Sequence, residues 1–297
     1  MLKLQLNRKI TKKIIFLLFR ITVIPLLVRE FIQRNKVTII LFHDLSKDRA
    51  ERYFKWLKKK YNIIPLSSYL DYLKDATQKL PRKSLIITFD DGHKSNYELL
   101  PIIKKLNIPI TIFLCSGIIN TKKHFWFLHP LKGKTSQYFK NLQDRERLKE
   151  LSKLGYWDEK EFEQRQALNY EEIKEMIPHV DFQAHTVTHP ILPQCDLEKS
   201  KYEIIHSKRH LEAEFNLKIT SIAFPNGDFS NREIEIAKDH YQSCLTLEVG
   251  YNSDRSDPYK LKRLSLPDDA SLNEVIIKTS GIFHLVKAFL NRFKNLS

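Results

Sequence analysis

Unbroken runs of apolar and β-branched residues constrain the fold of this chain most. Such runs cover residues 37–42, 85–89 and 110–114, and none of them alternates regularly between apolar and polar side chains. Strands of this kind are typical of a parallel sheet that is buried on both faces. The other predicted strands cover residues 61–65, 180–184, 219–224 and 241–246.

Helical patterns separate these strands along the chain. No turn signal such as Asn-Gly joins two neighbouring strands as a hairpin. The predicted helices cover residues 48–60, 67–74, 95–106, 169–177, 197–215, 231–240 and 271–293, and Pro101 lies inside the third of them. The alternation predicts an α/β fold, a somewhat irregular barrel of about seven parallel strands.

The rhythm of strands and helices suggests three parts. We expect a barrel domain at residues 36–270, preceded by a separate segment at 1–35 and followed by a basic helix at 271–297. Residues 121–169 are charged and contain no strand pattern, so they are predicted to be an insertion. The aromatic residues at 124–127 either line a sugar-binding cleft or pack inside the insertion, the commoner fate of such side chains.

The N-terminal segment combines basic and apolar residues. Its bases surround an apolar stretch at 14–28 that is too short, and too interrupted by Arg20 and Pro25, for a spanning helix of about 20 residues. No small-residue cleavage site follows it, which argues against a secretory signal. We expect an interfacial helix on an anionic membrane, and a helix packed on the domain is the alternative.

The overall charge and the cysteines limit the expected partners and the expected cellular compartment. The chain carries 50 Lys and Arg against 35 Asp and Glu, a net charge of +15, which suits an acidic partner but does not identify it. No aromatic and basic motif typical of nucleic-acid binding is present, so nucleic acid is not the expected partner. Three widely spaced cysteines form no disulfide framework. They favour a peripheral location on the cytoplasmic face of the membrane.

Polar residues follow the predicted strands where each strand ends. In a β/α barrel the reactive groups gather at the C-terminal ends of the strands. The residues at these positions are His43, Asp90, Asp91, His185, His189 and Asn226. An Asp-Asp-Gly sequence alone is more often a solvated turn, so its meaning depends on the other side chains at this rim.

Three of these residues suggest a metal site. His185 and His189 are four apart, and on one helical turn both rings would face the same way. Such a pair also occurs by chance on surfaces, but Asp91 can supply a third ligand from another strand. Two imidazoles and one carboxylate leave an open position, as in catalytic sites. Zinc is the default divalent ion, and cobalt or nickel can compete.

An open metal position favours hydrolysis of an acyl or amide bond, which also needs a base and an acid. Asp90 can take the proton of the water, and His43 can return one to the leaving amine. The backbone N–H of Asn226 can stabilise the oxyanion.

Three short motifs resemble those of the polysaccharide deacetylases, the NodB-homology or carbohydrate esterase family 4 proteins. The motifs are Thr88-Phe89-Asp90-Asp91-Gly92, His185-Thr186-Val187-Thr188-His189 and Ala223-Phe224-Pro225-Asn226-Gly227. The resemblance covers roughly residues 37–266. It implies a distorted (β/α)7 barrel, Asp90 as the base, Asp91 and both histidines as metal ligands, and Pro225, Asn226 and Gly227 as a substrate-binding turn.

The chain departs from this family pattern in two places. The third motif usually begins with an arginine that orients the base, and here the position is Ala223. We expect Arg263, near a late strand, to replace it, although a surface arginine is an equal alternative. The histidine motif near the C-terminus is a poor match at His284. The sequence around His43 is similar to the circularly permuted branch instead, so His43 is the expected acid.

These observations predict a metal-dependent hydrolase that removes acetyl groups, chiefly N-acetyl, from the sugars of a bacterial surface polysaccharide or its lipid-linked precursor. The alternative is a metal-containing barrel of weak or no activity that binds glycan at the membrane surface. The missing arginine at Ala223 is the feature that favours this alternative.

Overall fold

A computed structural model describes residue 14 and residues 16–75 and 77–282 of the 297-residue chain. The strands are β1 (Val37–Phe42), β2 (Asn62–Ile63), β3 (Ser84–Phe89), β4 (Thr111–Leu114), β5 (Asp181–Ala184), β6 (Ser221–Ala223), β7 (Ser243–Leu245) and β8 (Leu264–Ser265). Every pairing between these strands is parallel. Seven of them follow one another in the order β7-β6-β5-β4-β3-β1-β8, and the short β2 pairs with β3.

The two ends of this sheet approach each other. Leu261, three residues before β8, forms a parallel bridge with Leu245 of β7. β7 and β8 are the two end strands of the path, and β8 pairs with β1. The bridge at Leu261, beside β8, therefore closes the sheet against β7. The expected distorted (β/α)7 barrel is therefore confirmed.

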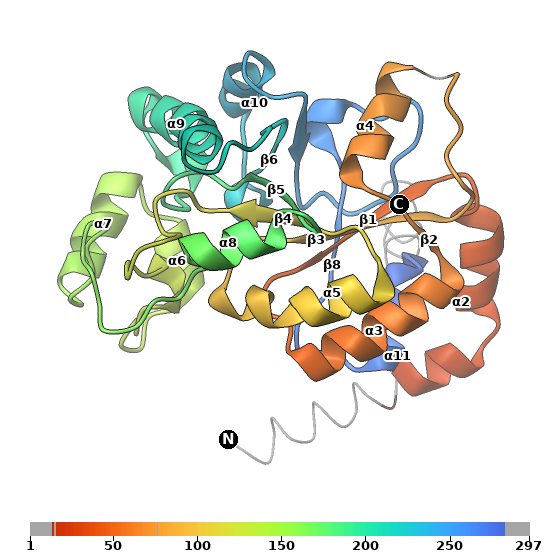
Figure 1. The fold of residues 1–297 in the computed structure, drawn as a ribbon. Helices are drawn as coiled ribbons and strands as arrows, with labels where there is room; N and C mark the ends of the chain where they lie inside the picture. The colour runs from red at the N-terminus through yellow and green to blue at the C-terminus, as the bar shows by residue number, and fades with distance from the viewer. Residues whose placement is uncertain (1–13, 15, 76, 283–297) are drawn as a thin grey trace, which may run out of the picture.

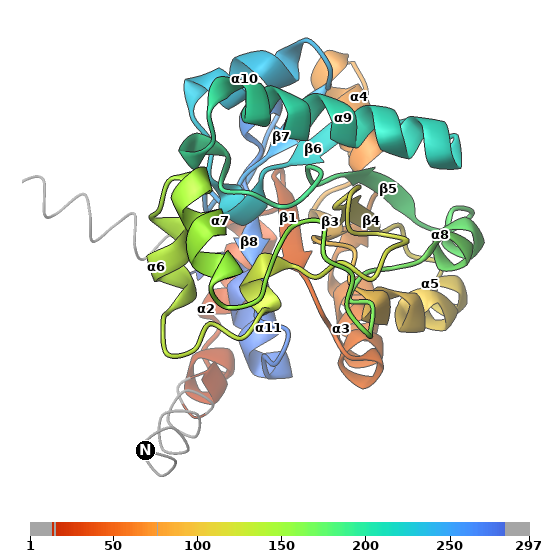
Figure 2. The same cartoon turned by 90° about the vertical axis from the view of Figure 1, so that its left-hand side faces the viewer.

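Helices surround the strands (Figure 1). They are α2 (Ile24–Leu27), α3 (Lys47–Lys60), α4 (Leu66–Lys74), α5 (Leu100–Leu106), α6 (Ser136–Lys140), α7 (Asp144–Ser152), α8 (Tyr170–Met176), α9 (Leu197–Phe215), α10 (Asn231–Lys238) and α11 (Leu272–Thr279). α9 packs on β5 and α10 on β7 (Figure 2). Shorter turns of 3-10 helix lie at Lys94–Leu99, Trp126–Leu128, Leu192–Gln194, Pro225–Gly227 and Pro258–Lys260, and a π-helix lies at Val28–Ile32.

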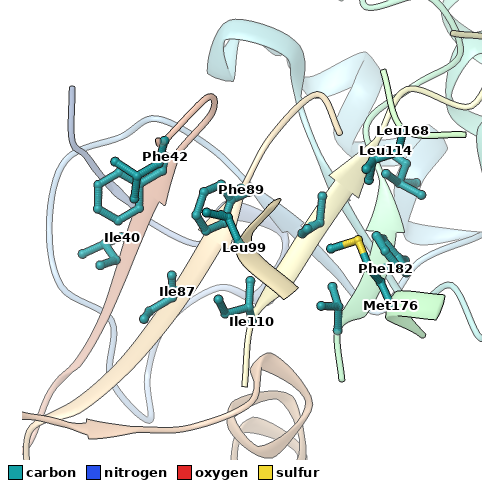
Figure 3. Close-up of a cluster of buried hydrophobic side chains, with 14 of the residues drawn as sticks. Ile40, Phe42, Ile87, Phe89, Leu99, Ile110, Leu114, Leu168, Met176 and Phe182 are labelled. Atoms are coloured by element: carbon teal, nitrogen blue, oxygen red, sulfur yellow. The ribbon is translucent and has the colours of Figure 1, made fainter. Parts of the chain in front are cut away.

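Two apolar layers hold the barrel together. One lies between the strands and the helices, where Phe42 and Phe89 stand side by side on β1 and β3 (Figure 3). The other fills the barrel interior with residues such as Ile39, Ile86 and Phe113. Successive strand residues point to opposite faces, so one unbroken apolar run supplies both layers.

The structure differs from the predicted helices most clearly in two places. The helix expected at 95–106 begins as 3-10 helix at Lys94 and becomes α5 only at Leu100, because Pro101 is tolerated in the first turn of a helix and not in its interior. The helix expected at 271–293 ends early: α11 stops at Thr279, and Gly281 has a positive φ of 68° that does not continue a helix. Residues 283–297 lie outside the described part, as does His284. α9 has the predicted bounds of 197–215.

The expected insertion at 121–169 contains α6 and α7, which lie to one side of the barrel in Figure 1. Trp126, Phe139 and Tyr156 form a small core with Leu151 and Ile191, whereas Phe125 belongs to the main core of the barrel. Trp126 is fully buried there. Packing, the commoner of the two fates considered for this aromatic cluster, is therefore the observed role of Trp126.

Candidate metal centre and active site

Most residues of the site lie at the C-terminal ends of the parallel strands. Asp90 and Asp91 follow β3, His185 follows β5, and Arg263 precedes β8. The Asp90 N–H donates to the carbonyl of Phe42 at 3.1 Å, which ties the end of β3 to the end of β1. The sheet therefore brings together residues that are up to 173 positions apart in the chain.

Asp90 is paired with Arg263. The two guanidinium Nη atoms donate to the two carboxylate oxygens at 2.7 and 2.9 Å, and Nε donates to the carbonyl of Thr246 at 3.0 Å. Arg263 is fully buried. Burial alone would raise the pKa of Asp90, but the Arg263 guanidinium, together with His185 and His43, outweighs burial and lowers the pKa. Arg263 thus occupies the place beside Asp90 that Ala223 leaves without a cation.

Asp91 faces the two histidines. Its Oδ1 lies 3.4 Å from Nε2 of His185 and 3.3 Å from Nε2 of His189, and all three residues are buried. Their ligand atoms lie within 4.8 Å of one another. Within the described residues, this Oδ1 is buried with no hydrogen-bond partner. A buried carboxylate oxygen without a donor, opposite two imidazole nitrogens, fits a divalent cation.

A hydrogen bond determines which ring nitrogen of His185 is available to bind a metal ion. Its Nδ1 lies 2.7 Å from the carbonyl of Ala223, a group that only accepts, so Nδ1 carries the proton. The lone pair of Nε2 is then free on the side of Asp91. Burial would lower the pKa of His185, and the nearby Asp90 carboxylate raises it. Burial lowers the pKa of His189 to about 3, so this ring is neutral at pH 7.

The two histidines do not lie on a helical turn, and that prediction was wrong. Residues 185–189 form a loop after β5 in which Thr186 and His189 have positive φ of 66° and 59°. The ring centroids nevertheless lie 4.9 Å apart. Asp91 also has positive φ, at 71°. Backbone strain of this kind persists where the surrounding structure enforces it, commonly at functional sites.

Two buried residues enforce the loop. Glu203 of α9 accepts hydrogen bonds from the N–H groups of Val187 and Thr188 at 2.7 and 2.8 Å. Trp126 of the insertion donates its indole N–H to the carbonyl of His189 at 2.9 Å. Neither role was predicted, because a carboxylate inside a helix and a buried tryptophan have no local pattern that names their partners.

His93 is a further residue that the sequence reasoning missed. Its Nε2 lies 3.1 Å from Oδ2 of Asp91, on the opposite side of the carboxylate from the other histidines. Burial would lower the pKa of His93, but its hydrogen bond to Asp91 raises it. The spacing of Asp91 and His93 across Gly92 was the available signal. His93 orients the carboxylate so that Oδ1 faces His185 and His189.

His43 and the Pro225–Gly227 turn complete the rim. His43 is half-buried, its backbone N–H donates to Asp268 at 3.0 Å, and His43 is among the neighbours that lower the pKa of Asp90. In the turn, Asn226 has a positive φ of 54°. A side chain at Gly227 would come within 2.5 Å of the backbone nitrogen of Leu247, so only glycine fits there.

This arrangement suits hydrolysis. A divalent ion held by Asp91, His185 and His189 would act as a Lewis acid and lower the pKa of water. Asp90 can accept a proton as a carboxylate, because the arginine beside it lowers its pKa. The turn at Asn226 lies at the end of β6, the strand whose Ala223 holds His185.

Comparisons with known proteins agree with this geometry. The polysaccharide deacetylase family model matches residues 77–243, more than half of the chain. YxkH of Bacillus subtilis (strain 168), a curated relative with a polysaccharide deacetylase name, is 25% identical over 242 residues, which cover 77% of this chain and 71% of that protein.

Solved structures share the fold. The Streptococcus pyogenes deacetylase PplD in complex with acetate aligns with a TM-score of 0.61 and 19% identity, over 83% of this chain and 99% of that one. IcaB from Ammonifex degensii aligns with a TM-score of 0.59 and 18% identity, over 84% and 98%. His43 and Arg263 lie outside the matched residues 77–243, within which Asp90, Asp91, His185 and His189 all fall. The chain belongs to the polysaccharide deacetylase family.

Proposed function

We propose that this protein is a metal-dependent deacetylase that removes acetyl groups, chiefly N-acetyl, from the sugars of a bacterial surface polysaccharide or its lipid-linked precursor. The supporting observation is the contrast between neighbouring carboxylates: Asp90 is paired with Arg263, and Asp91 presents a free oxygen to two imidazoles. The ion is zinc in this proposal, with cobalt or nickel as competitors for the same ligands.

The chain's own groups have separate tasks in the reaction. Asp90 accepts the proton of the attacking water, and the water oxygen forms a bond to the acetyl carbon. His43 gives a proton to the leaving amine as the carbon–nitrogen bond breaks, so that acetate and a free amine are the products. The N–H of Asn226 stabilises the negative charge on the acetyl oxygen.

The test is acetate release from an N-acetylglucosamine oligosaccharide. We expect release by the full chain, loss of release with a chelator, and recovery when a divalent ion is added back. Folded Asp90→Asn protein is the matched variant, since it keeps the proposed ligands. Release by this variant at the wild-type rate would contradict the assignment of the base. Release that chelation leaves unchanged would contradict the role of the metal.

We also propose that the N-terminal segment lies on an anionic membrane surface. Among the described residues, this segment carries most of the exposed large apolar side chains. They are Ile14, Leu17, Leu18, Phe19, Ile21, Val23, Ile24, Leu26, Leu27, Phe31 and Ile32. Phe16, by contrast, is buried against Ile277 and Ile282 and so attaches the segment to the domain. None of the helices among residues 14–282 that are described is long and apolar enough to cross a membrane.

A bilayer surface is the partner that suits this segment. Apolar side chains enter the acyl boundary while bases contact anionic head groups, and Lys3, Arg8, Lys9, Lys12 and Lys13 precede the apolar stretch. We place the protein on the cytoplasmic face, because its three cysteines are free and buried and need no oxidising compartment.

Vesicle sedimentation tests this association. The full chain is expected to sediment with vesicles that contain phosphatidylserine, and Ile21→Gln with Phe31→Gln is expected to weaken the binding. Leu128→Gln with Val249→Gln is the matched control, because both side chains are exposed elsewhere on the molecule. Equal loss in both double variants, or no binding by wild type, would overturn the proposal. Protease protection in spheroplasts tests the side of the membrane.

A further inference from the structure

A basic recess lies at the N-terminal ends of β1 and β3, the opposite end of these strands from the candidate active site. Its volume of about 340 Å³ is within the usual range of ligand pockets. Residues just before β1 and β3, together with the loop between β7 and β8, form its walls. The charged residues that line this basic recess are Arg34, Lys36, Lys79, Arg82 and Asp254.

The protein does not neutralise the basic side chains of this recess. All four are exposed, and none of them forms an ion pair within the part of the chain that the structure describes. Glu30, four residues before Arg34, is already paired with Arg29 and Lys83 at 2.8 and 3.1 Å. Asp254 is the one carboxylate among the lining residues, so the basic recess keeps an excess of positive charge. Such a hollow attracts an anion.

Backbone hydrogen bonds fix the shape of the basic recess before any ligand arrives. The N–H of Lys83 donates to the carbonyl of Arg34 at 2.8 Å, which joins the two segments that carry the cations. Val37 and Asn252 exchange two hydrogen bonds of 2.9 Å, which hold the third segment against the first. A preformed site of this kind loses little conformational freedom when it binds a ligand.

Exposed apolar side chains directly precede the basic recess in the chain. The π-helix ends at Ile32, two residues before Arg34, and both Phe31 and Ile32 are exposed. Gln33 between them is buried and donates its side-chain amide to the carbonyl of Thr279 at 2.8 Å, so this junction is fixed to the domain.

This combination of cations and apolar side chains fits a bilayer surface. A bilayer presents phosphate groups directly above an acyl region, and the two kinds of side chain can contact both at once. A nucleic acid also presents phosphates, but it offers no acyl region for Phe31 to enter. A lipid head group is therefore the phosphate source that accounts for both features.

We propose that the basic recess holds the phosphate group of an anionic phospholipid, with Arg34 and Arg82 as donors, while Phe31 enters the acyl boundary beside it. A guanidinium can donate two parallel hydrogen bonds to one phosphate, which gives the contact a defined geometry. This inference rests on the membrane association in the proposed function and not on the deacetylase chemistry. Because β1 and β3 run from the basic recess to the rim, a lipid bound here leaves the candidate active site free.

The test is sedimentation with phosphatidylcholine vesicles that contain phosphatidylglycerol. Arg34→Gln with Arg82→Gln is expected to bind about thirtyfold more weakly than wild type, the usual effect of two basic residues at an anionic surface. Arg145→Gln with Arg209→Gln should bind as wild type does, because it removes the same charge from exposed positions on α7 and α9. An equal loss in both double variants would overturn the lipid site while membrane association stands.

Binding without a bilayer separates this inference from the membrane association. Dihexanoyl phosphatidylglycerol below its micelle concentration, inorganic phosphate and a single-stranded RNA are each titrated by calorimetry into the full chain and into Arg34→Gln with Arg82→Gln. Binding of the short lipid that this variant loses supports the site even where vesicles are not bound. A variant that matches wild type in both assays overturns it.

The other two probes identify the source of the phosphate. Inorganic phosphate that binds wild type as tightly as the short lipid does would make a free phosphate the ligand and overturn the lipid. RNA that binds more tightly than the short lipid, and is lost in the same variant, would assign the basic recess to nucleic acid instead. Acetate release should be equal in wild type and in both double variants, because none of the four arginines lies in the candidate active site.

Discussion

Asp90 and Asp91 are neighbours in the chain but have different surroundings. Both oxygens of Asp90 accept hydrogen bonds from Arg263, whereas Asp91 receives His93 on one oxygen and leaves the other to His185 and His189. Both residues follow β3, and the positive φ of 71° at Asp91 turns its side chain away from the side on which Asp90 meets Arg263. The difference suggests that Asp90, whose two oxygens both accept hydrogen bonds and whose charge Arg263 stabilises, serves as the base. Asp91, which keeps one oxygen without a donor, would serve as the metal ligand.

The largest effect is expected on the Asp91 side. His185→Ala with His189→Ala removes two of three ligands, so metal binding and acetate release should both fall below detection. Metal content after gel filtration and acetate release check this, with circular dichroism as the control for folding. One bound ion per chain in the double variant would show that the metal ion binds elsewhere in the protein.

The next effect is expected on the Asp90 side. Asp90→Asn keeps the side-chain shape and should lower kcat by about 10²–10⁴-fold, the usual contribution of a general base. Metal content should remain that of wild type, because Asp90 is not a proposed ligand. Loss of both metal and activity would show that Asp90 also takes part in metal binding.

Arg263→Met tests what supports the base. Removing one partner of a buried ion pair costs about 3–5 kcal/mol, so the free energy of unfolding should fall by that amount in urea titrations. Burial then acts on Asp90 without an opposing arginine, and its pKa should rise. A carboxylate with a raised pKa is protonated at higher pH.

The acidic limb of the kcat/KM profile should therefore move to higher pH in Arg263→Met than in wild type. Arg255→Met is the control, since it removes an arginine whose side chain lies outside the pair. An unchanged acidic limb in folded Arg263→Met protein would show that Arg263 does not set the ionisation of the base.

The smallest effect is expected from His93, which contacts the metal ligand through its far oxygen. His93→Ala should weaken metal affinity by about 10–100-fold, the usual cost of losing a partner that orients a ligand. Competition with a chromophoric chelator measures the affinity. Activity should return at saturating metal, and a loss that metal cannot restore would give His93 a direct part in the reaction.

The parallel sheet could be predicted from the sequence because its strands are unbroken apolar runs such as residues 37–42, which fit only a doubly buried strand. The grouping of Asp91, His185 and His189 could be predicted because Asp91 lies just after β3 and both histidines lie in the loop that follows β5. A barrel places these positions on one rim whatever the details of the loops between them.

Other features depended on contacts between distant segments. The loop at 185–189 was mistaken for a helical turn, since its shape comes from Glu203 of α9. Trp126 reaches His189 across 63 positions, and no local pattern encodes that bond. Arg263 was expected beside Asp90 only as one of two equal alternatives, because the sequence shows a basic residue near a strand and not the direction of its side chain.

Metal stoichiometry in a matched pair of variants tests the central claim most directly. Asp90→Asn and Asp91→Asn each replace one carboxylate by its amide at neighbouring positions, and each is loaded with zinc, desalted and analysed for metal. The account predicts one ion per chain in wild type and Asp90→Asn, and none in Asp91→Asn. One ion in Asp91→Asn, or none in folded Asp90→Asn, would contradict the division of tasks between the two aspartates.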